Sequence, residues 1–480
     1  MMKSINPAAL AEFRSILGPS GCIEDQDLIA PWLKDWRGLY EGMTAAILAP
    51  DTTEQVVKVV QAAARHGIAL VPQGGNTSMV GGATPPADGS ALILSLRRMN
   101  RIRRIDPAAG IAVCDAGVIL QTLHEAALAQ GMRFPLSLGA KGSATLGGLA
   151  STNAGGTQVL RFGTMRGLTL GVEAVLPDGC LHDGLAPLKK DTRGYDPNQL
   201  LIGAEGTLGV ITAVAVRLVP ARAARAVAWV GLDSPHRALR LLRHMEGLSG
   251  EAIESFEVIP DGSLTLVLAH LPAARAPLSG SHRWHVLIEA VADEDAQGQM
   301  ESWLADAAAH DLLEDAIIAS SEAQAEALWL MRESVSAAER AHGPAMQHDI
   351  AVPVDDMPRF MEDATRAIET AFPGVSASGF GHLGDGNVHF HVRAPAGVDG
   401  PAWRASEGKA ASRMVYDLVT AANGSISAEH GIGQMKRDEL ARLSAPARLH
   451  LLRAVKQALD PQGLFNPGKL VPLAFEGTPA

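Results

Sequence analysis

The segment between residues 51 and 67 has the apolar periodicity of an amphipathic helix. Its apolar residues recur at the spacing of one helix face: Val56, Val57, Val60 and Ala64. Asp51, with Glu54 three residues later, resembles a capped helix start, and Gly67 ends the pattern. Further along, strand-length apolar runs and one more helical pattern follow: 68–71, 92–96 and 111–114 as strands, and 118–130 as a helix.

After Pro220 the pattern changes to an alternation of strand-like and helical segments. The strand-like runs cover 226–232, 264–268 and 285–291, and the helical patterns cover 234–246, 293–308 and 322–340. This alternation favours an α+β protein with a second domain that starts near residue 223. We therefore expect three parts, which are residues 1–222, residues 223–424 and a largely helical closing segment, 425–480.

Composition and charge narrow the class of protein. The 480 residues suffice for two or three domains, and the shares of hydrophobic (47%) and charged (19%) residues are those of a globular protein. The net charge of −11 argues against nucleic acid or an anionic membrane surface as the main partner. Three isolated cysteines, no signal-peptide pattern and no apolar run of about 18 residues lead us to expect a cytoplasmic protein without a transmembrane segment.

Three glycine-rich segments lie within the predicted first domain. They are PQGGNTSMVGG at 72–82, the stretch from 139 to 171, and GAEGTLGVIT at 203–212. A Rossmann fold does not explain them, because no GxGxxG stands between a strand and a helix, and the sequence has no GxxxxGK[ST] loop. Many backbone N–H groups in such loops can face anionic oxygens. The segments therefore predict a backbone that lies against a large ligand with a pyrophosphate group.

Two histidine-containing motifs in the last quarter of the chain predict a metal-assisted active site. His382 and His389 flank the turn of GHLGDGNVH, so a residue at each end of the bend can reach a common point. Glu429, in SAEHGIG, adds a carboxylate, and two neutral imidazoles with one carboxylate form a ligand set with an open position for zinc, manganese or iron. His430, next to Glu429, is a candidate base. A single histidine here is more often a hydrogen-bonded core residue, but the three ligands together favour a metal.

These motifs resemble a known family of flavoproteins. PQGGNTSMVGG, SLGAKGSATLGGLASTNAGG, DGC, GAEGTLGVIT and NPGK are similar to the FAD-binding domain of the vanillyl-alcohol-oxidase/p-cresol-methylhydroxylase superfamily. GHLGDGNVH and AEHGIG resemble its D-2-hydroxyacid dehydrogenase branch, which includes D-2-hydroxyglutarate and D-lactate dehydrogenases and the flavin subunit of glycolate oxidase. The resemblance covers about residues 40 to 470. It implies a two-subdomain FAD-binding domain and a substrate domain with an antiparallel sheet.

The same resemblance implies which residues hold FAD. The residues around the pyrophosphate would be Pro72, Gln73, Gly74, Gly75, Asn76, Thr77, Gly81 and Gly82. The flavin and its ribityl chain would be lined by Ser137, Gly139, Ser143, Thr145, Gly148, Asn153 and Gly156, the adenine side by Glu205, Gly206 and Ile211, and the isoalloxazine by Asn466. Some relatives attach FAD covalently through a histidine of the first loop. This loop has none, so we expect non-covalent FAD.

A substrate site is implied around a helical pattern. Arg332 and Ser336 are four residues apart, so they share a helix face, and an arginine can bind a carboxylate with two hydrogen bonds. The resemblance implies that this pair contacts a substrate carboxylate, together with a lysine further along the chain. Here that position is Gln347, and His391 stands where D-2-hydroxyglutarate dehydrogenases usually have asparagine. Both differences put a dicarboxylate substrate in question, and His391 is an alternative metal ligand or base. A solvated helix face is the alternative interpretation of Arg332.

The function that follows from the resemblance is an FAD- and divalent-metal-dependent oxidation of a D-2-hydroxy acid, of the D-2-hydroxyglutarate or D-lactate type, to the 2-oxo acid. A metal, zinc first, would bind the substrate, His430 would take the hydroxyl proton, and the C2 hydrogen would leave as hydride to flavin N5. An electron-transfer flavoprotein or a quinone would accept the electrons, and a homodimer is the default expectation. The alternatives are a flavin subunit of a glycolate-oxidase-like complex and a non-redox flavin enzyme of the alkylglycerone-phosphate synthase type.

Overall fold

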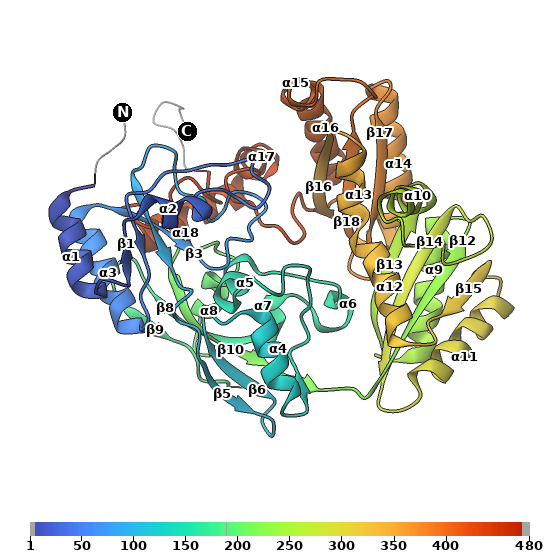
Figure 1. Cartoon of the computed structure of the whole chain (residues 1–480), viewed down its shortest axis with the longest axis horizontal. Coiled ribbons are helices and arrows are strands. Elements are labelled where there is room, and N and C mark those ends of the chain that lie inside the picture. The colour runs from blue at the N-terminus through green and yellow to red at the C-terminus, as the bar shows by residue number, and fades with distance from the viewer. Residues whose placement is uncertain (1–4, 189, 473–480) are drawn as a thin grey trace. The chain divides into compact units, whose positions relative to one another are not determined.

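The computed structural model describes residues 5–188 and 190–472 (Figure 1). These residues form two compact units. The first is drawn from Met1–Gly155, Gly163–Ala221 and Glu429–Ala480, and the second from Gly156–Phe162 and Arg222–Ala428. The chain therefore leaves the first unit after residue 221 and returns to it at Glu429, so the predicted closing segment folds mostly with the N-terminal part.

The first unit begins with a four-stranded sheet in the order β1-β2-β4-β3. Its strands are β1 (Cys22–Ile23), β2 (Ile47–Leu48), β3 (Ala69–Gln73) and β4 (Ala91–Ser95). Strands β2 and β3 both run parallel to β4, and β1 is antiparallel to β2. The helices of this region are α1 (Pro7–Leu17), α2 (Gln26–Ile29), the short 3-10 helix η1 (Ala30–Trp32) and α3 (Thr53–His66).

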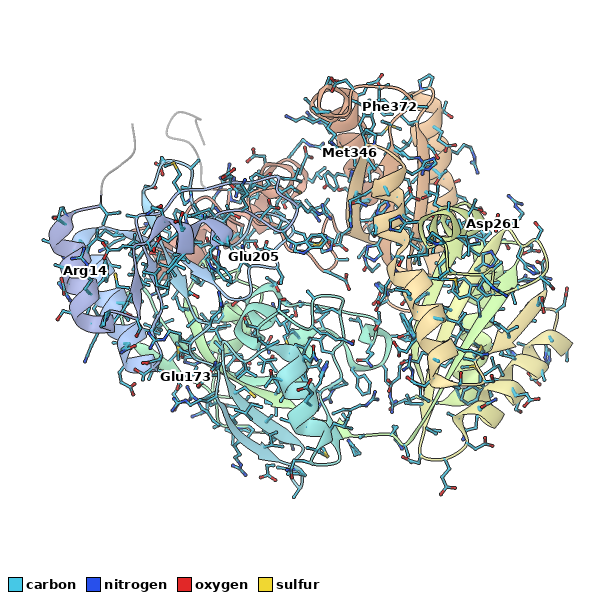
Figure 2. All side chains as sticks on the ribbon, viewed as in Figure 1. Arg14, Glu173, Glu205, Asp261, Met346 and Phe372 are labelled. Carbon is cyan, nitrogen blue, oxygen red and sulfur yellow. The ribbon has the colours of Figure 1, made fainter. Side chains whose placement is uncertain are left out.

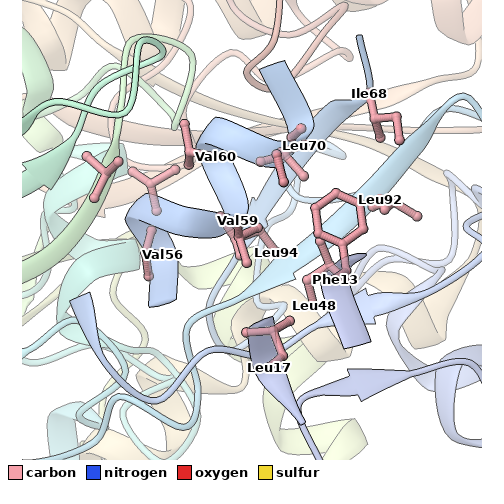
Figure 3. Packing of buried hydrophobic residues seen from close by; sticks show 14 of the residues in the cluster. Phe13, Leu17, Leu48, Val56, Val59, Val60, Ile68, Leu70, Leu92 and Leu94 are labelled. Atoms are coloured by element: carbon pink, nitrogen blue, oxygen red, sulfur yellow. The ribbon is translucent and has the colours of Figure 1, made fainter. Parts of the chain in front are cut away.

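Helix α3 confirms the first predicted helix and corrects its cap. The Thr52 hydroxyl, and not Asp51, accepts a hydrogen bond from the Gln55 N–H at 3.2 Å, and Gly67 ends the helix in the left-handed region at φ 63°. One face of α3 packs with α1 and the sheet into a buried core (Figure 3), which includes Phe13, Leu17, Leu48, Val56, Val59, Val60, Leu70, Leu92 and Leu94. Burial of this apolar face, rather than intrinsic propensity, is what stabilises the helix.

A second sheet completes the first unit. It has five antiparallel strands in the order β5-β6-β10-β8-β9. Their bounds are β5 Ile102–Asp106, β6 Ile111–Asp115, β8 Thr169–Val175, β9 Leu181–Asp183 and β10 Val210–Arg217. A two-stranded ribbon pairs β7 (Met132–Arg133) with β11 (Val219–Pro220). The helices here are α4 (Leu120–Leu128), α5 (Leu146–Thr152), α7 (Met165–Leu168) and α8 (Pro197–Leu201).

The C-terminal segment joins the first unit through backbone pairing. Helices α17 (Arg437–Leu443) and α18 (Pro446–Leu459) precede Phe465, which forms a parallel bridge to Leu70 of β3. The Leu70 N–H donates to the Leu464 carbonyl, and the Asn466 N–H donates to the Leu70 carbonyl, each at 2.8 Å. These bonds place the FNPGK motif beside the strand that leads into the first glycine loop.

The second unit is built on a seven-stranded antiparallel sheet in the order β15-β12-β14-β13-β17-β18-β16. The strands are β12 Ala224–Leu232, β13 Ile253–Pro260, β14 Trp284–Ala292, β15 Asp315–Ile318, β16 Ala345–Ala351, β17 Ser376–His382 and β18 Asn387–Arg393. The helices are α6 Val159–Phe162, α9 Pro235–Ser249, α10 Asp261–His270, α11 Ala296–Ala309, α12 Glu322–Glu333, α13 Val335–His342, η2 Val354–Asp356, α14 Met357–Ala371, α15 Gly400–Ala405 and α16 Glu407–Ala421.

Helices cover both faces of this sheet. Phe390 of β18 packs against Phe360 of α14, with ring centroids 6.2 Å apart, and α9, α11 and α16 lie in the same layer. On the other face, α10, α12 and α13 pack against a core of β-strand residues that includes Trp229, Leu287 and Phe380. Because side chains alternate along a strand, His389 and His391 of β18 point to the face opposite Phe390, which is the α12–α13 face.

The structure corrects three predicted elements and adds a strand that the sequence prediction missed. Residues 264–268, predicted as a strand, lie in helix α10, because Leu264 and Val267 are buried three residues apart on one helix face. The strand of this region is β13, which the prediction missed. The predicted helix 322–340 is two helices that break at Ser334, and the predicted helix 118–130 is confined to α4. Within the described residues, no helix is both long and apolar enough to cross a membrane.

Candidate active site

The first unit contains a cavity of about 430 Å³ between the glycine loops. Its lining includes thirteen of the residues predicted to hold FAD: Pro72, Gln73, Gly74, Gly75, Asn76, Thr77, Gly82, Gly139, Thr145, Gly148, Glu205, Gly206 and Ile211. The first loop follows β3, the second surrounds α5, and the third leads into β10. Strand β3, helix α5 and strand β10 therefore position the three loops around one cavity.

Other predicted cofactor residues lie outside the cavity lining: Gly81, Ser137, Ser143, Asn153, Gly156 and Asn466. Gly156 belongs to the second unit. Ser143 supports the lining through its backbone, and Asn153 ends α5 and accepts a hydrogen bond from the Arg166 N–H at 2.8 Å. The structure thus places these residues, apart from Gly156, as supports of the loops or beside them.

The first two glycine loops pack closely against each other at Gly74 and Gly75. A Cβ on Gly75 would lie 1.9 Å from the Ser143 carbonyl oxygen, and a Cβ on Gly74 would lie 2.2 Å from Thr145 Oγ1. Both separations are far below van der Waals contact, so only glycine allows this approach. The composition of the loops is therefore required by their packing, and the packing creates the walls of the cavity.

Residues in the left-handed backbone region gather around this cavity. Asn76, Glu205 and Asn466 have φ values of 53°, 51° and 44°. Such conformations cost free energy in residues other than glycine, and they persist where the surroundings fix them. Here the Asn466 side-chain amide donates to the Glu205 carbonyl at 2.7 Å and to the Gly82 carbonyl at 2.9 Å. Asn466 therefore holds the first and third loops together from the C-terminal segment.

Glu205 links the third loop to the AEHGIG motif. It is buried in the first unit (Figure 2), and its carboxylate accepts hydrogen bonds from the N–H groups of Ile432 and Gly433, each at 2.7 Å. Burial raises the pKa of Glu205, and the two N–H groups oppose that rise. The carboxylate thus fixes the backbone that follows Glu429 and His430, both of which line the cavity.

The cavity fits the FAD that the loops predict. Buried side-chain oxygens of Gln73, Thr145 and Asn466 have no hydrogen-bond partner among the described residues. Such groups need an acceptor or donor from a ligand or from water. The glycine loops add backbone N–H groups, which suit a pyrophosphate. Together they offer polar contacts along a cavity whose remaining walls are largely apolar, as a dinucleotide with an isoalloxazine ring requires.

Sequence reasoning missed several residues of the cavity. Ser78, Ser151 and Thr152 lie within the glycine-rich motifs, so their polar side chains at these positions could have been noticed. Trp36 also lines the cavity, but it precedes every glycine loop and carries no local signal. Only the three-dimensional fold shows that Trp36 lies at the cavity.

In the second unit, strands β17 and β18 form a hairpin that brings two predicted metal ligands together. The ring centroids of His382 and His389 lie 5.4 Å apart. At the turn, the Asn387 N–H donates to Asp385 Oδ1 at 2.9 Å, and Gly386 has φ 79°. These are features of a tight turn that favours Asp and Gly, and they set the spacing between the two histidines.

His382 is buried within an ionic cluster. Its Nδ1 lies 2.5 Å from Glu257 Oε1, and Arg332 Nε donates to Glu257 Oε2 at 2.8 Å. Burial alone would raise the pKa of Glu257, but its interactions with His382 and Arg332 outweigh that effect and lower the pKa to about 2. Sequence reasoning missed Glu257, because nothing near it in the chain signals its partners.

The remaining predicted substrate residues lie on the same face of the sheet. Gln347 of β16 is directly opposite His391 of β18, and its side-chain amide donates to the Ser336 carbonyl at 3.3 Å. Arg340 Nη1 donates to Gln347 Oε1 at 3.4 Å. Arg332 lies on α12 and Ser336 on α13, so the break at Ser334 separates the two residues that were expected on one helix.

The donor set of the second unit fits a divalent metal. Since Glu257 contacts His382 at Nδ1, a metal would bind this ring through Nε2, as in many metal-bound histidines. His389 supplies a second imidazole nearby. In a separate group, His244 of α9, Asp306 of α11 and His310, the residue after α11, have ligand atoms within 4.8 Å of one another. Any metal measurement must therefore separate the two groups.

Comparisons with known proteins agree with these features. Residues 44–184 match a family model described as an FAD binding domain, and residues 221–470 match one described as the C-terminal domain of FAD linked oxidases. A mitochondrial D-2-hydroxyglutarate dehydrogenase of Arabidopsis thaliana is 33% identical over 98% of this chain and 83% of its own length. The corresponding protein of Bos taurus is 36% identical over 95% of this chain and 82% of its own.

Further relatives and solved structures extend the comparison. A D-2-hydroxyglutarate–pyruvate transhydrogenase of Saccharomyces cerevisiae is 32% identical over 98% of this chain and 95% of its own. The structure of p-cresol methylhydroxylase with substrate bound has a TM-score of 0.77 at 16% identity, with 98% of both chains covered. An alkyldihydroxyacetonephosphate synthase has a TM-score of 0.73 at 16% identity, with 98% of this chain and 87% of that one covered. The predicted α+β fold of the p-cresol-methylhydroxylase type is therefore confirmed.

Proposed function

The chain belongs to the FAD-linked oxidase family, in its D-2-hydroxyacid dehydrogenase branch, and on this premise we propose that it oxidises a D-2-hydroxy acid to the 2-oxo acid. The observation that carries the proposal is the position of His430. His430 lines the same cavity as the three glycine loops, so a candidate base belongs to the wall of the space that fits FAD. When bound there, FAD supplies the acceptor for the hydride from the substrate C2.

His430 is the proposed catalytic base. It would take the proton of the substrate hydroxyl, and the hydrogen bonds from the Ile432 and Gly433 N–H groups to Glu205 would keep its backbone in place. Arg332, Ser336, Gln347 and His391 would bind and orient the acid. At Gln347 and His391 this chain differs from the residues expected in D-2-hydroxyglutarate dehydrogenases. D-lactate and D-2-hydroxyglutarate are therefore both substrates to test.

A divalent metal, zinc first and manganese or iron as alternatives, is part of the proposal. His382 and His389 of the hairpin would hold it together with Glu429, the residue at which the chain re-enters the first unit. When bound, the metal supplies a Lewis acid that lowers the pKa of the substrate hydroxyl. Two imidazoles and one carboxylate suit these metals.

The electron acceptor, assembly and location complete the proposal. Electrons from reduced FAD would go to an electron-transfer flavoprotein or a quinone, and the default assembly is a homodimer.

The three cysteines, none in a disulfide, support a reducing compartment such as the cytoplasm, whereas the named plant and bovine relatives are mitochondrial. Cell fractionation with an antibody to the protein would decide between these compartments.

The test is anaerobic flavin absorbance of the purified protein with D- and L-2-hydroxy acids, before and after treatment with a chelator. We expect D-acids alone to bleach the flavin, the chelator to abolish bleaching, and a divalent metal to restore it. Absence of bleaching by any acid, with FAD and metal both present, would contradict the proposal. It would leave the synthase type and the flavin subunit of a larger complex as the alternatives.

A further inference from the structure

We infer that Glu257 is a positioning residue that holds His382 and Arg332 in one buried unit, and thereby links the metal site to the substrate site. The inference rests on the proposed function. Glu257 lies 125 residues before His382 in the sequence, yet β13 and β17 pair so that the two residues stand directly opposite each other. The sheet register therefore fixes the contact, and no flexible loop is involved.

The geometry gives each carboxylate oxygen one partner. Oε1 lies 2.5 Å from His382 Nδ1, while Oε2 accepts from Arg332 Nε at 2.8 Å and lies 2.7 Å from Arg332 Nη2. Glu257 is fully buried, and His382 and Arg332 are 8% and 7% exposed. Separating these groups would leave a buried charge without a partner, and that costs much free energy. The arrangement is therefore fixed.

This arrangement selects the tautomer of His382. The ion pair with Arg332 keeps Glu257 ionised, and an ionised carboxylate only accepts hydrogen bonds. The Nδ1 of His382 must therefore carry a hydrogen, and the lone pair of the neutral ring is then on Nε2. A histidine fixed in this way is oriented for a metal and is a stronger ligand than a free one.

The same carboxylate limits what Arg332 can offer. Its Nε is occupied by Glu257, so a substrate carboxylate can bind only through the terminal nitrogens of the guanidinium. The guanidinium also lies over the ring of Phe380, with the carbon 5.3 Å from the ring centroid. Glu257 and Phe380 thus fix the direction of Arg332, and loss of the carboxylate should disturb metal affinity and substrate affinity together.

The experiment measures metal affinity of the metal-depleted protein, without turnover. All variants carry His310→Ala, which removes one ligand from the separate group of His244, Asp306 and His310. Zn²⁺ is titrated against a chromophoric chelator, and Co²⁺ absorbance reports the ligand geometry. Glu257→Gln keeps the size of the side chain but lets an amide face Nδ1, which favours the wrong tautomer. We expect its dissociation constant for Zn²⁺ to rise about 10- to 100-fold, with an altered Co²⁺ spectrum.

The matched control is Glu289→Gln. Glu289 is also a largely buried carboxylate of this sheet, and it pairs with Arg225 at 2.9 Å and accepts from Trp329 of α12, the helix of Arg332. Its loss should leave the Zn²⁺ constant within about twofold. Should Glu257→Gln fail to fold, the double variant Glu257→Gln/Arg332→Met removes both buried charges and tests the same affinity.

The outcomes separate the two proposals. Weak metal binding in Glu257→Gln but not in Glu289→Gln supports the inference. Equal Zn²⁺ affinity of Glu257→Gln and the parent overturns the positioning role and leaves the proposed function intact. Absence of stoichiometric Zn²⁺ binding in the parent overturns the metal site itself, and with it both the positioning role and the metal-dependent part of the proposed function.

Discussion

At the scale of single residues, the proposed reaction depends on His430, which lines the cavity of the glycine loops. Replacement by glutamine keeps a polar side chain but removes the imidazole that would act as the base. We expect the rate of anaerobic flavin reduction by a D-2-hydroxy acid to fall by about 10²- to 10⁴-fold, because general-base catalysis contributes that much. Stopped-flow absorbance measures the rate, and the FAD content of the variant should remain that of the parent.

A fall of less than tenfold would contradict the role of His430. The base would then be sought at His391, the alternative that the sequence itself offers. His391 lies on the α12–α13 face of the second unit, beside Phe380 with ring centroids 5.0 Å apart. The variant His391→Asn restores the residue expected from the resemblance, and it serves as the comparison because it should alter substrate preference more than the rate of reduction.

Local motifs point to some candidate site residues and not to others. His382, His389, Glu429 and His430 could be selected from sequence because each stands in a short motif whose spacing has a chemical meaning. Glu257 could not, because its role depends on the register between β13 and β17, and no local pattern encodes that register. Trp36 is likewise brought to the cavity by the fold alone.

At the scale of elements, the contact between the first two glycine loops determines whether the cavity can form. Gly75→Ala would place a methyl group 1.9 Å from the Ser143 carbonyl oxygen, so the loops must separate. We expect the purified variant to lose most of its FAD, as measured by the ratio of flavin to protein absorbance. A folded apoprotein with a native circular dichroism spectrum would show that the effect is local.

The control for this variant is Gly142→Ala in the second loop. A Cβ at Gly142 would meet only Gln121 Oε1, at an ordinary contact distance of 3.5 Å. This change should leave the FAD content unchanged. Full FAD occupancy in Gly75→Ala would mean that the loops have more freedom than the close approach implies, and it would remove the packing explanation for the glycines.

Elements with a clear helix or strand periodicity were predicted well. Elements whose apolar residues fit both the helix and the strand periodicity were not. Helix α3 has one apolar face and clear ends, so only its cap was misassigned. The run Leu264–Leu268 alternates like a strand, yet it lies in α10, where the residues at helical spacing pack on the sheet. Strand β13 carries buried charged residues, Glu254 and Glu257, which weakens the apolar signal of a strand.

At the scale of the whole molecule, the return of the chain to the first unit could be expected from the order of family motifs but not from periodicity. NPGK is a motif at the end of the chain, and the structure places it beside β3, near the start. Short-range patterns contain no information on such long-range pairing. The pairing buries Lys469 together with Asn466, and this burial has a consequence that can be measured.

Lys469 makes the stability of the protein depend on pH. Burial, helped by the nearby charge of Arg437 and opposed by Glu205, lowers the pKa of Lys469 from 10.5 to about 8. Between these two values the unfolded chain holds a proton that the folded chain has released, so the free energy of unfolding rises as pH rises through this window. The contribution amounts to about 3 kcal/mol over the full window, since each pKa unit corresponds to about 1.4 kcal/mol.

The prediction is tested by urea unfolding of the parent, of Lys469→Met and of the exposed-site control Lys58→Met, at about pH 7.5 and about pH 9.5. The parent and Lys58→Met should gain stability relative to Lys469→Met as the pH is raised, because only they release the buried charge. Other groups that titrate in this range are common to all three proteins and cancel in the difference. If the free energy of unfolding depends on pH in the same way in all three proteins, the pKa of Lys469 is not lowered in the folded state. The C-terminal segment would then not bury Lys469 in solution.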